Sequence, residues 1–295
     1  GAPPEILSTS PEHRPTDRWL ERTIGDAARH LAELRDAIFA ELDCRRQNRI
    51  LVLRADPGLL VWEAVRTVPE GGVWAQVDNA ESAHRLRHQA RALGALRSPQ
   101  WLECPPEDIP QCLDDAGDPD VRFETVIGRN VCLRTPHPER TLARFGERLA
   151  ASGTVVLCEV LPRHAQRLAD LLPDDALNGD LASRLRNAED ALYESDCGQA
   201  RAWDADDLRR WFLDAGFDGV QLRTLEQSRR QPISAPLLDR WFANSATTDA
   251  RSYADVLATS LSPREIDTVE RAFRARLTGK TVPWRSTHAI ARASR

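Results

Sequence analysis

The chain has 295 residues, of which 41% are hydrophobic, and its formal net charge at pH 7 is −5. A chain of this length can bury a full core, as one large domain or as one domain with an appendage. No apolar run reaches the roughly 20 residues that a transmembrane helix needs, and the first residues lack the pattern of a signal peptide. We therefore predict a globular, cytoplasmic protein with no membrane segment.

The basic residues are almost all arginine, since Lys280 is the one lysine of the chain. These arginines are interleaved with acidic residues along most of the sequence, which is typical of a solvated surface. Nucleic-acid binding is therefore left open but is not indicated. The chain also lacks methionine and starts with GAPPE, so we expect a fragment of a longer protein.

The cysteines and histidines do not have the spacing of a metal site. The six cysteines are scattered without a CxxC pair, and no His/Cys spacing is typical of zinc. His84 and His88 lie four residues apart and could share a helix face, but no third ligand lies nearby in the sequence. The pattern predicts reduced thiols and no metal site.

Residues 1–16 are rich in Pro and Ser and predict a linker. Through 17–47, apolar residues recur at spacings of three and four, which predicts a helical extension that packs against the edge of a sheet. Strand-like runs follow at 50–53, 72–77, 100–104, 123–128 and 153–160, and helical segments separate most of them. This alternation predicts a parallel, doubly wound α/β sheet.

The pattern changes beyond residue 165. Asp204 is the predicted N-cap of a helix that ends at a glycine, and a strand follows. Residues 226–281 predict a helical insert with a capping box at Ser262 and Glu265, and a last strand follows at 282–293. The insert is expected to fold over the carboxyl ends of the sheet. Its aromatic residues are expected either to face the sheet or to bury a small core of the insert itself: Trp241, Phe242, Tyr253 and Phe273.

The order of these signals resembles that of class I S-adenosylmethionine-dependent methyltransferases. The segments that carry the resemblance are ILVLRADPG, GGVWAQVDNAE, CPPEDIP, FETVIGRNVCL, GTVVLCEVLP and DDLRRWFLDAGF. The resemblance covers residues 48–225 and 282–295 and implies a doubly wound, mostly parallel seven-stranded Rossmann-like sheet, with the insert before the last strand. It also implies S-adenosylmethionine as cofactor, bound across the carboxyl ends of the strands.

The first strand of such a sheet usually ends with an acidic residue and a glycine loop. Aligned on Gly58, the acidic position falls on Val52 and the first loop glycine on Asp56. A side chain at Asp56 is expected to crowd a loop that needs bare backbone, and its charge needs a cationic partner such as the ammonium of the cofactor or an arginine. These two changes predict weak or absent binding of S-adenosylmethionine.

The next two loops supply further candidates. The carboxylate that binds the ribose hydroxyls is expected after the second strand, where Val77 takes the aligned position and Asp78 follows one residue late. After the third strand, the resemblance implies that Asp108 accepts from the adenine amino group and that Ile109 packs on the ring. The alternative for Asp108 is a solvated turn or a helix cap.

The fourth and fifth strands end near the predicted methyl-transfer position. Arg129 and Asn130 are expected to face the cofactor and the substrate, although Asn130 is equally suited to cap a turn. Glu159 and His164 follow the fifth strand, and His164 is a weak candidate for a general base. The sequence lacks the DPPY-like or NPPY-like segment of nucleic-acid amino-methylating enzymes, and it identifies no catalytic residue.

Three segments also resemble the methyltransferase-like domain joined to the C-terminus of RarA-type recombination ATPases in some cyanobacteria. They are GLLVWEAVRTVPEGGVWA, VIGRNVCLR and VPWRSTHAIARA. Three hypotheses follow: an active methyltransferase on an unknown acceptor, a degenerate and inactive binding module beside a DNA-maintenance AAA ATPase, or an unrelated nucleotide-binding protein. The degenerate methyltransferase-like domain is our preferred interpretation.

Overall fold

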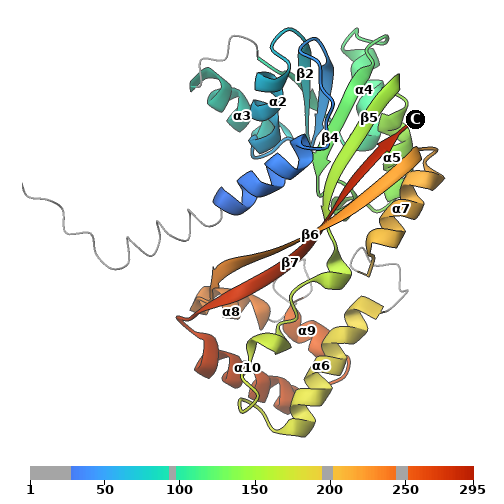
Figure 1. The fold of residues 1–295 in the computed structure, drawn as a ribbon. Helices are drawn as coiled ribbons and strands as arrows, with labels where there is room; N and C mark the ends of the chain where they lie inside the picture. The colour runs from blue at the N-terminus through green and yellow to red at the C-terminus, as the bar shows by residue number, and fades with distance from the viewer. Residues whose placement is uncertain (1–27, 93–97, 195–201, 244–251) are drawn as a thin grey trace, which may run out of the picture.

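A computed structural model describes residues 28–92, 98–194, 202–243 and 252–295. Its strands form one sheet in the order β3-β2-β1-β4-β5-β7-β6 (Figure 1). Their bounds are β1 (Arg49–Leu53), β2 (Gly72–Val77), β3 (Gln100–Glu103), β4 (Phe123–Arg129), β5 (Leu149–Val160), β6 (Asp218–Pro232) and β7 (Thr281–Ser294). β1 to β5 are parallel, whereas β7 is antiparallel to both β5 and β6. The prediction of a doubly wound, mostly parallel seven-stranded sheet is confirmed.

β1 lies at the centre of the parallel part, paired with β2 on one side and with β4 on the other. Ile50 to Leu53 are wholly buried because helices cover both faces of the sheet. Alternate residues of β1 enter two different cores, so Leu51 and Leu53 lie in one and Ile50 and Val52 in the other. A strand buried on both faces has a continuous apolar sequence, which is why this strand could be predicted.

Two layers of helices form these cores (Figure 1). The core around Leu51 is covered by α4 (Ile109–Asp115), α5 (Pro138–Gly146) and α7 (Ala205–Asp214). The core around Val52 is covered by a helix of residues 28–39 together with α2 (Leu59–Thr67) and α3 (Ala80–Ala92).

The helix of residues 28–39 was expected at the sheet edge, and the structure corrects its place. Its Leu34 and Ile38 are wholly buried in the core around Val52, so the helix lies over a face of the sheet. It still reaches the edge strand β6, because the side chain of Gln227 donates to Glu33 at 3.1 Å. The predicted linker 1–16, and residues 17–27 of the predicted extension, lie outside the described residues.

β6 and β7 continue past the sheet as a two-stranded ribbon (Figure 1). β5 stops pairing with β7 at Val160, opposite His288, whereas β6 and β7 remain paired as far as Pro232 and Thr281. The ribbon carries helices at its far end, on the side to which the carboxyl end of β5 points. We call residues 162–194, 233–243 and 252–280 the helical lobe. Its helices are α6 (Gly179–Glu194), α8 (Ala235–Trp241), α9 (Tyr253–Leu257) and α10 (Pro263–Leu277), with the short turns η3 (Pro162–His164) and η4 (Ala169–Leu171).

The helical lobe has a core of its own, which includes Leu185, Leu238 and Phe273. The four predicted aromatic residues pack on one another, with the rings of Phe242 and Phe273 5.6 Å apart and those of Trp241 and Phe273 6.1 Å apart. The aromatic residues therefore bury a core of the lobe itself. This confirms the second of the two expectations. The insert was predicted to begin at residue 226, whereas β6 continues to Pro232.

Several local predictions can be compared directly with the structure. Asp204 is the N-cap of α7, and Ser262 and Glu265 form the predicted capping box of α10. The helical segment between the predicted strands 123–128 and 153–160 is short, because α5 ends at Gly146 and β5 begins at Leu149. Leu149 pairs with Phe123 of β4, and this contact with a distant strand extends β5 backwards.

Candidate cofactor site

The loop between β1 and α2 turns sharply at Gly58. Its φ is +99°, a left-handed conformation that favours glycine. A Cβ atom at this position would lie 2.6 Å from Nε1 of Trp62 and 3.0 Å from Leu86. The backbone N–H of Gly58 donates to the carbonyl of Ala55 at 2.7 Å, which closes the turn. Gly58 is therefore required by the close approach of α2 and α3.

Arg54 is the second residue of this loop with a left-handed backbone, at φ +47°. It directly follows β1, so Arg54 rather than Asp56 takes the conformation in which a glycine is favoured. Its Nη1 atom lies 2.5 Å from a carboxylate oxygen of Asp78, and its Nη2 atom donates to the carbonyl of Arg134 at 3.1 Å. Only 11% of the Arg54 side chain is exposed, so the guanidinium lies inside the cleft.

Gln76, a wholly buried polar residue of β2, fixes this arrangement. Its side-chain oxygen accepts from the backbone N–H of Arg54 at 2.8 Å. Its amide nitrogen donates to Asp78 at 3.1 Å and to the carbonyl of Cys104 at 2.6 Å. One side chain thus joins the loops that follow β1, β2 and β3. Neither Gln76 nor Arg54 was predicted from the sequence as a site residue, although a glutamine inside the apolar run GVWAQV was a visible signal.

The cleft that these loops enclose has a volume of about 110 Å³. This volume is below the range of about 300–1,000 Å³ that is usual for small-molecule sites. The cleft is lined by Arg54, Ala55, Asp56, Val77, Asp78, Asn79, Ser82 and Arg134.

Asp56 does not crowd the loop, contrary to the expectation from the sequence. Its side chain is 38% exposed and points along α3, where it accepts from Ser82 Oγ at 3.2 Å and from Arg85 at 2.5 Å. The cationic partner that the sequence required is therefore Arg85. Val52, at the expected acidic position, is wholly buried in the core, so β1 offers no carboxylate to the cleft.

The two candidates after β3 lie away from the cleft. Asp108 is exposed at the end of the turn η1 (Pro106–Asp108), where α4 begins, and it does not line the cavity. Ile109 is wholly buried in the core beneath α4. Ile109 has no exposed surface in this structure, and its packing on an adenine ring stays a prediction.

The two candidates after β4 have different surroundings. Asn130 has a left-handed φ of +52°, and its side-chain oxygen accepts from the backbone N–H of Val160 at 3.1 Å. This contact joins the ends of β4 and β5 across 30 residues of sequence, so it is not the local turn cap of the alternative. Arg129 is half-buried, and burial lowers the pKa of its guanidinium.

Glu159 and His164 also differ in their surroundings. Glu159 is wholly buried and accepts from the backbone N–H groups of Val131 at 2.7 Å and Leu133 at 3.2 Å. Burial raises the pKa of this carboxyl to about 7. Its contacts hold the turn η2 (Cys132–Arg134) against β5. His164 is exposed in η3, and neither residue lines the cleft.

The described residues do not contain a group of three His, Cys, Asp or Glu side chains placed to bind a metal ion. His84 and His88 are exposed on α3. Within the same ranges, no helix is long and apolar enough to cross a membrane.

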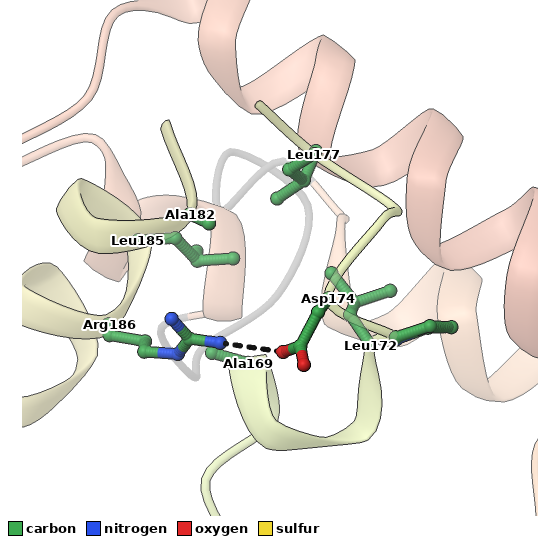
Figure 2. Close-up of a pocket in the computed structure, with 8 residues that line it drawn as sticks. Ala169, Leu172, Asp174, Leu177, Ala182, Leu185 and Arg186 are labelled. Carbon is green, nitrogen blue, oxygen red and sulfur yellow. Dashed lines mark ion pairs between the residues drawn. The ribbon is translucent and has the colours of Figure 1, made fainter. Parts of the chain in front are cut away.

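Further hollows among the described residues lie outside the cleft. One of about 880 Å³ lies at the amino ends of β2 and β3, which is the opposite end from the loops described above. One of about 320 Å³ lies where the helical lobe meets the end of β5, between Val160, Tyr253 and Trp284. The third, inside the lobe, measures about 20 Å³ and has room for one water molecule. Figure 2 shows its lining, in which Arg186 and Asp174 form an ion pair at 3.6 Å.

Known structures share this architecture. A candidate methyltransferase from Bacillus halodurans is 14% identical, with a TM-score of 0.52 over 89% of this chain and 97% of its own. Geranyl diphosphate C-methyltransferase from Streptomyces coelicolor, solved with Mg²⁺, geranyl diphosphate and S-adenosylhomocysteine, is 13% identical, with a TM-score of 0.53 over 97% of this chain and 86% of its own. YcgJ from Bacillus subtilis is 12% identical, with a TM-score of 0.51 over 90% of this chain and 99% of its own. At these identities the similarity is one of fold.

A search of curated proteins finds no match. The family described as Methyltransferase domain matches residues 25–222. Because this match spans more than half of the chain, the chain belongs to the Methyltransferase domain family.

Proposed function

We propose that this methyltransferase domain binds S-adenosylmethionine weakly or not at all, because Arg54 takes the place of the cofactor ribose. The observation that carries the proposal is the contact between Arg54 and Asp78, at 2.5 Å, inside a cleft of about 110 Å³. Asp78 follows β2 and lines the cleft, so it is the carboxylate best placed for the two ribose hydroxyls. Its acceptor oxygens already bind Arg54 and Gln76.

The expected loss of affinity follows from the contacts that a cofactor must replace. Releasing Arg54 from Asp78 removes a hydrogen bond between charged groups, and such bonds contribute about 1.5–3 kcal/mol. The missing carboxylate at Val52 removes a contact of similar size. Together these losses amount to roughly two to four orders of magnitude, so a micromolar affinity becomes a dissociation constant above about 100 micromolar.

Calorimetric titration with S-adenosylmethionine and S-adenosylhomocysteine tests the proposal. We expect Arg54→Gly to bind S-adenosylmethionine at least about tenfold more tightly than the wild type. The substitution frees Asp78 and places a glycine at a position with a left-handed backbone. Arg134→Gln is the matched control, since it removes a cation that lines the same cleft without freeing Asp78. We expect this control to remain within about twofold of the wild type.

Asp56→Gly tests whether Asp56 occupies the position of the first loop glycine, as the sequence alignment on Gly58 predicts. The left-handed residue is Arg54, and Asp56 binds Ser82 and Arg85, so Asp56→Gly is expected to give no gain in affinity. Low-micromolar binding by the wild type would contradict the proposal and favour an active methyltransferase, in which Arg54 moves out to admit the cofactor. An equal gain from Asp56→Gly and Arg54→Gly would mean that Arg54 is not the obstacle.

The association with a RarA-type ATPase stays a prediction from the sequence resemblance. The role as an inactive binding module and the cytoplasmic location also stay predictions from the sequence.

A further inference from the structure

The hollow of about 320 Å³ between the helical lobe and the end of β5 is lined by aromatic rings, and we call it the aromatic hollow. The rings come from four separate elements: Tyr193 from α6, Trp241 from α8, Tyr253 from α9 and Trp284 from β7. The ring centroids of Trp241 and Trp284 lie 6.2 Å apart, so the lobe and the β6–β7 ribbon meet in this lining. The volume falls within the range of about 300–1,000 Å³ that is usual for small-molecule sites.

A buried carboxylate belongs to the same lining. Glu189 is 2% exposed and lies one helical turn before Tyr193 on α6, so the two side chains share a face of the helix. Its carboxylate accepts from the backbone N–H groups of Leu168 at 2.5 Å and Ala169 at 2.8 Å, and from the hydroxyl of Tyr253 at 3.3 Å. These three donors are neutral, so they fix the position of the carboxylate without balancing its charge.

The cations near the aromatic hollow are engaged elsewhere. Arg167 pairs with Asp190 at 2.8 Å, and its guanidinium lies over the ring of Tyr193, 3.7 Å from the centroid. Arg285 also lines the hollow, but its side chain is exposed and points to the opposite face of β7 from Trp284. Within the described part of the chain, no basic side chain forms an ion pair with Glu189. Burial accordingly raises the pKa of its carboxyl, and the charge of Arg167 offsets this only in part.

We propose that the aromatic hollow binds a small organic ammonium ion. The face of an aromatic ring attracts a cation within about 6 Å of its centroid, and the attraction is stronger where water is excluded. Arg167 on Tyr193 shows that one ring of the lining already holds a cation in this way. The charge of the buried Glu189 favours the same sign of ligand, because it acts through the low-dielectric interior. An anion would meet a carboxylate and the negative faces of the rings, and both contacts are unfavourable.

The position in the fold is also that of a ligand site. The aromatic hollow includes Val160, the last residue of β5, and ligands of α/β sheets usually bind outside the carboxyl ends of the strands. It shares no lining residue with the cofactor cleft, which lies after β1 and β2. The inference therefore goes beyond the proposed function, and it holds whether or not S-adenosylmethionine binds.

Calorimetric titration of the whole chain with choline, without S-adenosylmethionine, tests the proposal. Choline is a small quaternary ammonium ion, and 3,3-dimethylbutan-1-ol is its neutral isostere, in which carbon replaces the charged nitrogen. We expect choline to bind with a dissociation constant of about 1 mM or below, and the isostere to bind at least about tenfold more weakly. Equal binding of the two would overturn the proposal in favour of an apolar site without charge preference. No binding of choline would overturn the site itself.

Two variants test the residues of the lining. Trp284→Leu removes one aromatic face and retains an apolar side chain, so we expect it to weaken choline binding about fivefold or more. Trp211→Leu is the matched control, because Trp211 is a partly buried tryptophan of α7 outside the hollow, and its loss should change binding by less than about twofold. Glu189→Gln removes the charge and should weaken binding about tenfold or more.

The result does not depend on the folding of the Glu189 variant. Trp284→Leu leaves the contacts of Glu189 intact, so it decides the question even if Glu189→Gln unfolds the lobe. Choline should also shift the indole N–H NMR signals of Trp241 and Trp284 in the wild type, while that of Trp211 stays in place. Equal weakening by the Trp284 and Trp211 variants, or unchanged signals from Trp241 and Trp284, would overturn the site.

Discussion

Arg54 combines two unfavourable features that the surrounding residues offset. A left-handed conformation costs a non-glycine residue about 1–2 kcal/mol. A largely buried guanidinium also needs acceptors, and Arg54 has Asp78 and the carbonyl of Arg134. The buried Gln76 holds the backbone of Arg54 in this conformation through its side-chain oxygen. Because three partners bind Arg54, its backbone and side chain have defined positions inside the cleft.

His288 gives a prediction at the same scale. Burial, with further contributions from His30 and Arg129, lowers the pKa of its imidazole to about 4. The folded-state value lies below the unfolded value of about 6.5, so the unfolded chain binds more protons between these two pH values. The stability that neutral His288 contributes is therefore present above pH 6.5 and is lost as the pH falls towards about 4.

We expect an NMR titration of the His288 ring to give a midpoint near pH 4. His288→Gln should flatten the decline of the unfolding free energy between about pH 6.5 and 4, by about 1–3 kcal/mol. His164→Gln is the control, because His164 is exposed and should leave the slope unchanged. A midpoint near the ordinary value of about 6.5 would contradict the buried environment.

At the scale of single elements, α7 depends on its N-cap. Asp204 accepts from the backbone N–H groups of Asp206 at 3.0 Å and Asp207 at 3.4 Å, and the side chain of Asp207 accepts from the N–H of Asp204 at 2.9 Å. Asp204 also lies 2.5 Å from Arg163. α7 covers the core under β7 with Leu208 and Phe212, so the cap stabilises a helix that the sheet requires.

We expect Asp204→Ala to lower the unfolding free energy by about 1–2 kcal/mol, the usual effect of losing an N-cap. Asp206→Ala is the matched control, because Asp206 is exposed on the same first turn and should change stability by less than about 0.5 kcal/mol. Asp204→Asn should retain most of the stability, since an asparagine oxygen also caps. Chemical unfolding followed by circular dichroism measures all three. Equal losses from the Asp204→Ala and Asp206→Ala variants would mean that charge, not capping, stabilises this turn.

At the scale of the whole molecule, the sheet and the helical lobe have separate cores joined by the β6–β7 ribbon. Phe273 is wholly buried at the centre of the lobe core. Phe273→Ala removes a large apolar side chain and is expected to destabilise the lobe by about 3–5 kcal/mol. Because the lobe core is separate, the strands of the sheet should retain their protection.

Hydrogen exchange followed by mass spectrometry measures this difference between the two parts. In Phe273→Ala we expect faster exchange in α8 and α10 and unchanged exchange in β1 and β4. Leu213→Ala is the control, because Leu213 lies 53% exposed on α7 and should leave both parts unchanged. Loss of protection in β1 together with the lobe would show that the two cores unfold as one unit.

The sequence by itself determined the sheet. β1, β2 and β4 are buried on both faces, so each is a nearly continuous apolar run that stands out from the amphipathic helices between them. The caps at Asp204 and Ser262 were equally readable, because a cap involves residues only two or three positions apart. Such signals are local, and local periodicity is what a single sequence records.

Only the tertiary structure decided what the loops and the ribbon do. The second half of β6, SRRQP, has no apolar alternation, and it is a strand because β7 pairs with it. Arg54 meets Asp78 across 24 residues of sequence, and Tyr253 meets Glu189 across 64 residues. These contacts depend on how the strands are ordered and how their ends are packed, so no local pattern records them. The chemistry of both proposed sites therefore comes from packing between distant segments on a sheet that the sequence alone predicts.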